Sequence, residues 1–98
     1  MQANAPEIRN LNELRTYVHE TLCELNDFEP GAFAITERLI VRSGEPCGIF
    51  FCMNGPRSVK VTAIWETDTS SVLFYGSTGE RTQRTRLVGA PRLAAAAA

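Results

Sequence analysis

His19 and Cys23 are the two residues whose types and spacing most directly suggest chemistry. Four residues apart on a helix they share a face, and a base beside a cysteine can generate a thiolate nucleophile. Such a nucleophile also needs a group that orients the base, and none is near in the sequence. We therefore interpret the pair as a surface histidine beside a half-buried cysteine, and we expect no catalytic residues.

Together with Cys47 and Cys52, this pair gives four side chains of the types that bind zinc. The spacing argues against such a site. Cys47 and Cys52 are five residues apart in a predicted strand, so they point to opposite faces and lie about 16 Å apart. This distance also excludes a disulfide between them. We expect no metal ligands and no cofactor.

A basic group near the C-terminal end is the second candidate site. Arg84 and Arg86 share one face of a predicted strand, whereas Arg81 lies on the other face unless a bulge resets it. We favour an edge strand that charge protects against aggregation. The alternative is a nucleic-acid surface that also includes Arg57 and Lys60, although few aromatic residues are interleaved with these cations.

A single amphipathic helix comes first among the elements that position these residues. Asn10 and Glu13 resemble a capping box, and residues 26–31 contain the signals that end the helix. The apolar residues recur at helical spacing and form a narrow seam suited to packing on a sheet. This seam consists of Leu11, Leu14, Val18, Leu22 and Leu25.

The hydrophobic period then changes to that of strands. Short turns separate the strands, which favours an antiparallel meander because parallel strands need long crossovers. The expected strands are Phe33–Arg42, Cys47–Asn54, Ser58–Glu66, Val72–Tyr75 and Glu80–Val88. Because Glu37 interrupts the apolar face of the first strand, we expect a bulge or a late strand start there.

The sequence thus predicts an α+β fold with one N-terminal helix packed on a four- or five-stranded antiparallel β-meander. We expect a single domain over residues 1–93, in which residues 1–9 form a loose arm. The alanine run at residues 94–98 is left out of this fold.

The predicted strand Cys47–Asn54 is apolar on both faces, which a strand with one solvated face should not be. Five strands form a sheet about 24 Å wide, whereas one helix is about 10 Å across. Another element must therefore cover the second face: a second copy, another protein, a ligand, sheet curvature, or the arm and tail. We expect that face to include Phe50, Cys52, Ile64, Ile40 and Tyr75.

The overall charge of −1 gives no general attraction to nucleic acids or acidic membranes. The distribution is uneven, because acids concentrate in residues 1–30 and arginines in residues 80–98. We expect these two segments to attract each other within the fold, the alternative being a basic edge that meets an anionic partner. Three cysteines without a secretory signal indicate the cytoplasm, and no apolar run is long enough to cross a membrane.

Three segments, SGEPCGIFF (43–51), MNGPRSVKV (53–61) and FYGSTGER (74–81), resemble a family of short bacterial proteins with no assigned activity. The resemblance covers most of residues 11–87 and implies no catalytic residues, because that family has no catalytic motif attached to it. It therefore adds no site residue to those named above.

Together, these features favour a non-enzymatic cytoplasmic interaction module. We expect it to form a homodimer or to bind another protein through the uncovered apolar sheet face, without membrane contact. Two alternatives are nucleic-acid binding through the basic C-terminal strand and small-molecule binding in a pocket of a curved sheet.

Overall fold

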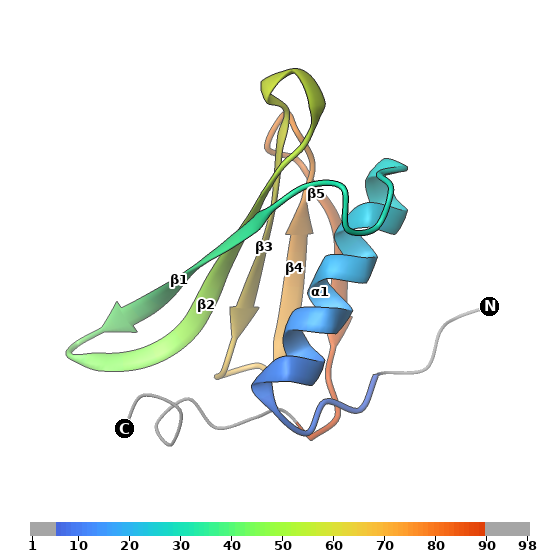
Figure 1. Ribbon diagram of the computed structural model, residues 1–98. Coiled ribbons are helices and arrows are strands. Elements are labelled where there is room, and N and C mark those ends of the chain that lie inside the picture. The colour runs from blue at the N-terminus through green and yellow to red at the C-terminus, as the bar shows by residue number, and fades with distance from the viewer. Residues whose placement is uncertain (1–5, 90–98) are drawn as a thin grey trace.

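A computed structural model describes residues 6–89 of the chain. It contains one helix and one five-stranded antiparallel sheet, whose strands follow each other in chain order (Figure 1). The predicted α+β meander is therefore confirmed, and its fifth strand belongs to the main sheet. The elements are α1 (Leu11–Asn26), β1 (Ile35–Arg42), β2 (Glu45–Asn54), β3 (Lys60–Glu66), β4 (Ser71–Tyr75) and β5 (Arg81–Arg86), with a short 3-10 turn at Pro56–Ser58.

The start of α1 has the predicted cap. The Glu13 backbone N–H donates to Asn10 Oδ1 at 2.9 Å, which satisfies a donor that the helix leaves unpaired. The Glu13 carboxylate accepts from the backbone N–H of Arg9 at 2.8 Å and from its guanidinium. These contacts, the backbone hydrogen bond first, hold the pKa of Glu13 below its ordinary value. The helix ends at Asp27, whose φ of 56° is left-handed.

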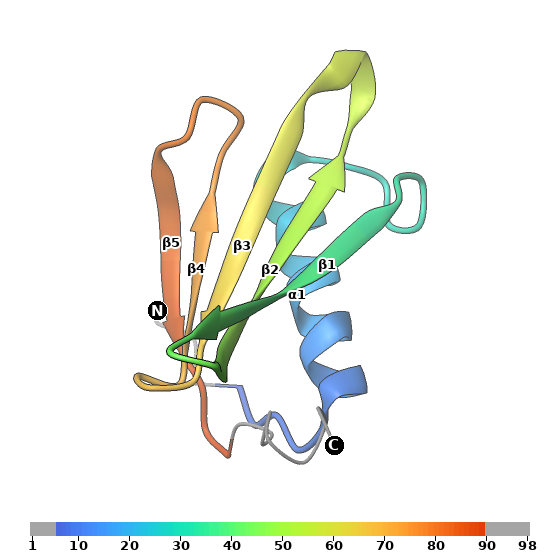
Figure 2. The same cartoon turned by 90° about the vertical axis from the view of Figure 1, so that its left-hand side faces the viewer.

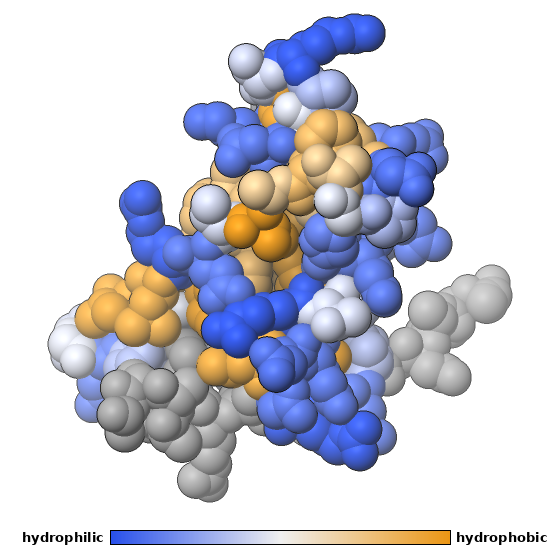
Figure 3. Space-filling view, in the orientation of Figure 1, coloured by the Kyte–Doolittle hydropathy of each residue, from blue (hydrophilic) through white to orange (hydrophobic). Residues whose placement is uncertain are grey.

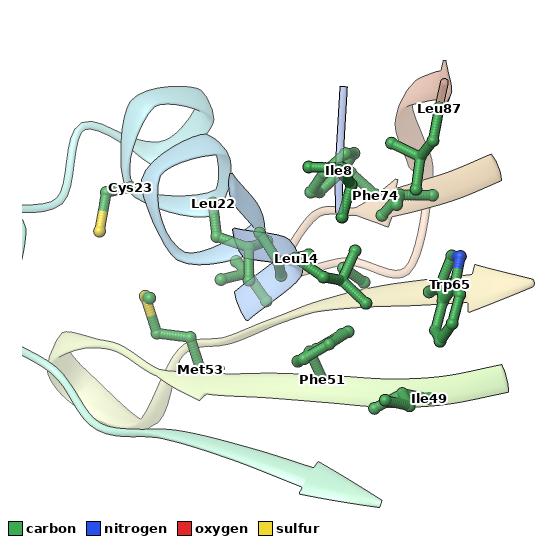
Figure 4. Close-up of a cluster of buried hydrophobic side chains, with 14 residues drawn as sticks. Ile8, Leu14, Leu22, Cys23, Ile49, Phe51, Met53, Trp65, Phe74 and Leu87 are labelled. Atoms are coloured by element: carbon green, nitrogen blue, oxygen red, sulfur yellow. The ribbon is translucent and has the colours of Figure 1, made fainter. Parts of the chain in front are cut away.

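The core lies between α1 and one face of the sheet (Figure 4). Leu14, Val18 and Leu22 of the predicted seam are fully buried, whereas Leu25 is 38% exposed. The sheet contributes the alternate residues of β2, β3 and β4, among them Phe51 and Trp65, and both are fully buried.

The first strand differs in detail from the prediction. It begins at Ile35, and Phe33 in the loop before it packs edge-on against Phe28, with 5.2 Å between the ring centroids. Figure 3 shows apolar side chains gathered near this loop and framed by hydrophilic ones. Glu37 faces the helix layer and forms an ion pair with Arg15, and no bulge lies there. The irregularity in β1–β2 pairing occurs instead between Ile40 and Val41.

Part of the N-terminal arm is hydrogen-bonded to the segment that follows β5. The Ile8 N–H donates to the Val88 carbonyl and the Val88 N–H donates to that of Pro6, both at 2.9 Å. Ile8 is 3% exposed and belongs to the core. The expectation of a loose arm is therefore wrong for residues 6–9, because Ile8 buries its side chain; residues 1–5 and 94–98 lie outside the described residues.

Candidate functional site: the open face of the sheet

The face of the sheet turned away from α1 is the candidate site, and we call it the open face. In Figure 2 the five strands lie in front of the helix, so this face is toward the viewer. The strand register arranges its side chains in rows that run across the sheet from β1 to β5. Opposite residues on neighbouring strands have Cβ atoms about 5 Å apart, so each row is a continuous surface.

The central row has an apolar middle and a cation at each end. It consists of Arg38, Phe50, Ile64, Leu73 and Arg84, in order from β1 to β5. Phe50 and Ile64 are half-buried and Leu73 is 9% exposed, whereas both arginines are exposed. A shallow apolar strip therefore runs between two guanidinium groups.

A second row lies beside it, toward the β2–β3 hairpin. It consists of Thr36, Cys52, Thr62, Tyr75 and Arg81. Tyr75 and Cys52 are half-buried, and Arg81 is exposed. This row is more polar in the middle than the central row, and it has a cation only at the β5 end.

The third row, on the other side of the central row, consists of Ile40, Gly48, Glu66, Ser71 and Arg86. Gly48 is buried, and a Cβ at this position would collide with the Trp65 carbonyl oxygen. A hollow of about 290 Å³ lies at this row, bounded among others by Ile40, Arg42 and Glu66. Its volume is just below the ~300–1,000 Å³ typical of small-molecule sites.

The structure brings together all five residues predicted for the uncovered face. All five lie on the open face, and the side chain of each is half-buried: Ile40, Phe50, Cys52, Ile64 and Tyr75. The sequence left open which residues of β4 face outward, and the register selects Leu73 and Tyr75. Val72 and Phe74 point into the core instead.

The basic group predicted near the C-terminal end gathers on this same face, with one exception. A shift in the β4–β5 register places Arg81 opposite Tyr75 and Gln83 opposite Phe74, so Thr82 is the extra residue of a bulge. That bulge turns Arg81 to the side of Arg84 and Arg86. Arg57 instead lies in the turn Pro56–Ser58 at the hairpin tip, with a left-handed φ of 57°.

Arg38 and Arg42 are the open-face cations that the sequence analysis missed. Both alternate in β1 with residues of the helix side and therefore share the face of Ile40. Their spacing of two residues from Ile40 is the feature of the sequence that could have identified them. Among the strand residues, the open face then contains two carboxylates, Glu45 and Glu66, and six cations: Arg38, Arg42, Lys60, Arg81, Arg84 and Arg86.

The expected attraction between the acidic helix and the basic C-terminal segment forms no ion pair within residues 6–89, and Arg92 of that segment lies outside the described residues. The sheet separates the two, because α1 covers one face and the β5 arginines project from the other. Within residues 6–89 the ion pairs are Arg9 with Glu13 and Arg15 with Glu37, and neither involves β5. The β5 cations therefore face solvent.

His19 and Cys23 lie on the helix side, away from the open face. The Gly31 backbone N–H donates to His19 Nε2 at 3.2 Å, and Cys23 Sγ lies 3.8 Å from the same nitrogen. Cys23 is 3% exposed rather than half-buried, and burial raises the pKa of its thiol. A buried thiol with a raised pKa is a poor nucleophile. The hydrogen bond from Gly31 to His19 joins the loop after α1 to the helix.

No arrangement of three or more histidine, cysteine, aspartate or glutamate side chains within residues 6–89 is suited to hold a metal ion. The three cysteines are all free thiols. The described part of the chain has no helix with the length and apolarity that a membrane span requires.

Comparison of the chain with protein-family models, with characterised proteins and with solved structures gives no match. The open face is therefore interpreted from its own residues and geometry.

Proposed function

We propose that this protein is a non-enzymatic interaction module that binds an anionic macromolecule through the open face of its sheet. The observation that carries the proposal is the central row, in which Phe50, Ile64 and Leu73 lie between Arg38 and Arg84. An apolar strip framed by cations suits a partner that buries apolar area in the middle and places negative charge at the margins.

A second copy of the chain is a less suitable partner for this face than the sequence suggested. In a face-to-face homodimer, each open face with six cations and two carboxylates would meet an identical face. Like charges brought together at an interface oppose association. The charge distribution therefore favours a partner of opposite sign, either an acidic protein or a nucleic acid.

The small-molecule alternative has weaker support. The hollow beside Gly48 is small, and its rim mixes Arg42 with Glu66 and Asp68. We also propose a cytoplasmic location, on the ground that three free cysteines are typical of proteins in reducing compartments.

Placing a negative charge in the apolar middle of the central row tests the proposal. We expect Phe50→Glu to abolish binding of a fluorescein-labelled 15-residue polyglutamate or a labelled 15-nucleotide oligo(dT), measured by anisotropy in 20 mM salt. The reason is that the new carboxylate replaces apolar area and repels anions. Leu39→Glu is the matched control, because Leu39 is 45% exposed on β1 but points to the helix side.

Light scattering across a concentration series separates the remaining outcomes. The proposal is supported if the wild type is monomeric and binds either probe, and if Phe50→Glu abolishes this binding whereas Leu39→Glu does not. A salt-insensitive dimer that Phe50→Glu dissociates would assign the open face to a second copy instead. Failure of both probes to bind the wild type would overturn the proposal.

A further inference from the structure

The arrangement of aromatic and cationic residues on the open face indicates a more specific partner. We infer that the open face binds single-stranded nucleic acid, with Phe50 and Tyr75 stacking on bases and the arginines of β1 and β5 contacting phosphates. This inference rests on the proposed function, because it names the anionic macromolecule that the open face would take.

Each aromatic ring of the open face has an arginine as its outer neighbour. Arg38 of β1 lies opposite Phe50 of β2, and Arg81 of β5 lies opposite Tyr75 of β4. Both arginines are exposed, and both aromatic side chains are half-buried, so part of each remains accessible to solvent. A base stacked on such a ring would place its backbone within reach of the neighbouring guanidinium.

The two rings are separated enough to serve different nucleotides. Phe50 and Tyr75 are two strands apart, and Tyr75 lies two residues beyond Leu73, the β4 residue in the row of Phe50. Strand spacing and rise then give a separation of about 12 Å. Between the rings lie Ile64 and Thr62, which are smaller side chains and leave space for a strand to pass.

Phosphate contacts are available along the same path. Arg84 closes the central row, and Lys60 lies beyond Thr62 on β3, next to the second row. The carboxylates Glu45 and Glu66 lie at the opposite end of the face, near the β1–β2 and β3–β4 turns. An anionic backbone that crosses the two aromatic rows therefore meets cations and avoids both acids.

Single strands suit this surface better than duplexes or acidic peptides. Aromatic rings stack only on bases that are not already stacked in a helix, so a duplex would use the cations alone. An acidic peptide would likewise be held by the cations, and its apolar side chains would pack as well on leucine as on phenylalanine. Replacing the rings without removing their apolar volume therefore distinguishes the partners.

The test compares three labelled probes by anisotropy over a range of NaCl concentrations: a 15-nucleotide oligo(dT), a duplex of the same length, and a 15-residue polyglutamate. We expect oligo(dT) to bind most tightly. Phe50→Leu and Tyr75→Leu should each weaken it about 5- to 150-fold, the range that loss of base stacking gives, with little change in salt dependence.

Charge removal should have a different signature from ring removal. Arg84→Gln is expected to weaken oligo(dT) binding and to lower the slope of log affinity against log salt by about 0.7, as loss of one single-strand phosphate contact does. Leu39→Ala is the matched control on the helix side and should change neither quantity. Circular dichroism and the fluorescence of the buried Trp65 verify that each variant is folded.

Three results would overturn the inference. If polyglutamate binds as tightly as oligo(dT) and Phe50→Leu has no effect, the partner is an acidic protein and the proposed function stands. If the duplex binds as tightly as the single strand, the rings do not stack on bases. If no probe binds at 20 mM salt, both the inference and the proposed function are wrong.

Discussion

The three cysteine thiols differ in how deeply they are buried, which their spacing in the sequence does not indicate. Cys23 is buried under the loop after α1, whereas Cys47 and Cys52 are half-buried and Cys52 is part of the open face. Burial raises the pKa of the Cys23 thiol, so less of it is thiolate at neutral pH. Low thiolate content and low access both slow reaction with electrophiles.

We therefore expect iodoacetamide to modify Cys47 and Cys52 well before Cys23 in the native protein at pH 7.5. Peptide mapping by mass spectrometry after timed quenching measures the three rates. In urea the three rates should converge, which is the control for intrinsic reactivity. Fastest labelling at Cys23 in the native state would contradict its placement under the loop.

At the residue scale, alternation along the strands was enough to assign Phe50, Cys52, Ile64 and Ile40 to one face, but it left the orientation of Tyr75 in β4 open. Arg81 could not be assigned, because its orientation depends on the bulge at Thr82 and no local pattern announces that bulge. The role of Glu37 was equally hidden, since its partner Arg15 is 22 residues away on another element.

At the element scale, the Asn10 cap sets the position at which α1 begins. Asn10 accepts a hydrogen bond from the Glu13 N–H, and the Glu13 carboxylate accepts from Arg9 instead of returning a bond to Asn10. The capping box is thus shifted by one residue in its second half. Arg9 is thereby ordered at the junction between the arm and the helix.

Asn10→Ala should lower the free energy of unfolding by about 0.5–2 kcal/mol, because the alanine leaves a first-turn N–H without its acceptor. Urea denaturation followed by circular dichroism gives this quantity. Asn10→Ser is the matched control and should retain most of the stability, since a serine hydroxyl accepts the same bond. Equal losses in both variants would show that a side-chain acceptor at position 10 is not what stabilises the start of the helix.

The helix and all five strands could be predicted because their hydrophobic periods are distinct and glycine or proline marks several of the turns. The register irregularities at Ile40/Val41 and Phe74/Tyr75 could not, because backbone pairing between two strands sets them. Attachment of residues 6–9 also escaped prediction. It depends on the Val88 backbone, which is distant in the sequence.

At the scale of the whole molecule, the sheet separates charge of opposite sign. The helix layer carries Glu13, Glu20 and Glu24, whereas the open face carries the cations of β1 and β5. The chain as a whole has a charge of −1, so its net charge does not describe either side. This separation was not predicted from the sequence, because the acidic helix and the basic C-terminal segment were expected to attract each other.

Despite its negative net charge, we expect the protein to be retained on a cation-exchange column at pH 7 and low salt, because the open face can dock on the resin. Arg84→Gln should elute at lower salt than the wild type. Arg9→Gln is the matched control with the same change in net charge, and Arg9 lies beside the helix. Its elution should be unaltered, whereas wild-type protein in the flow-through would contradict the prediction.

The extra residue at Thr82 also has a consequence for how related chains should be compared. If the same residues alternated regularly without the bulge, Arg81 would turn toward the helix layer, because Gln83 already faces that layer and Thr82 would take the open face. A relative with the same arginines and one residue fewer at this point would hold its arginine on the open face without a bulge. Chain length around position 82 therefore has to be compared together with the arginines when homologues are sought for a shared binding role.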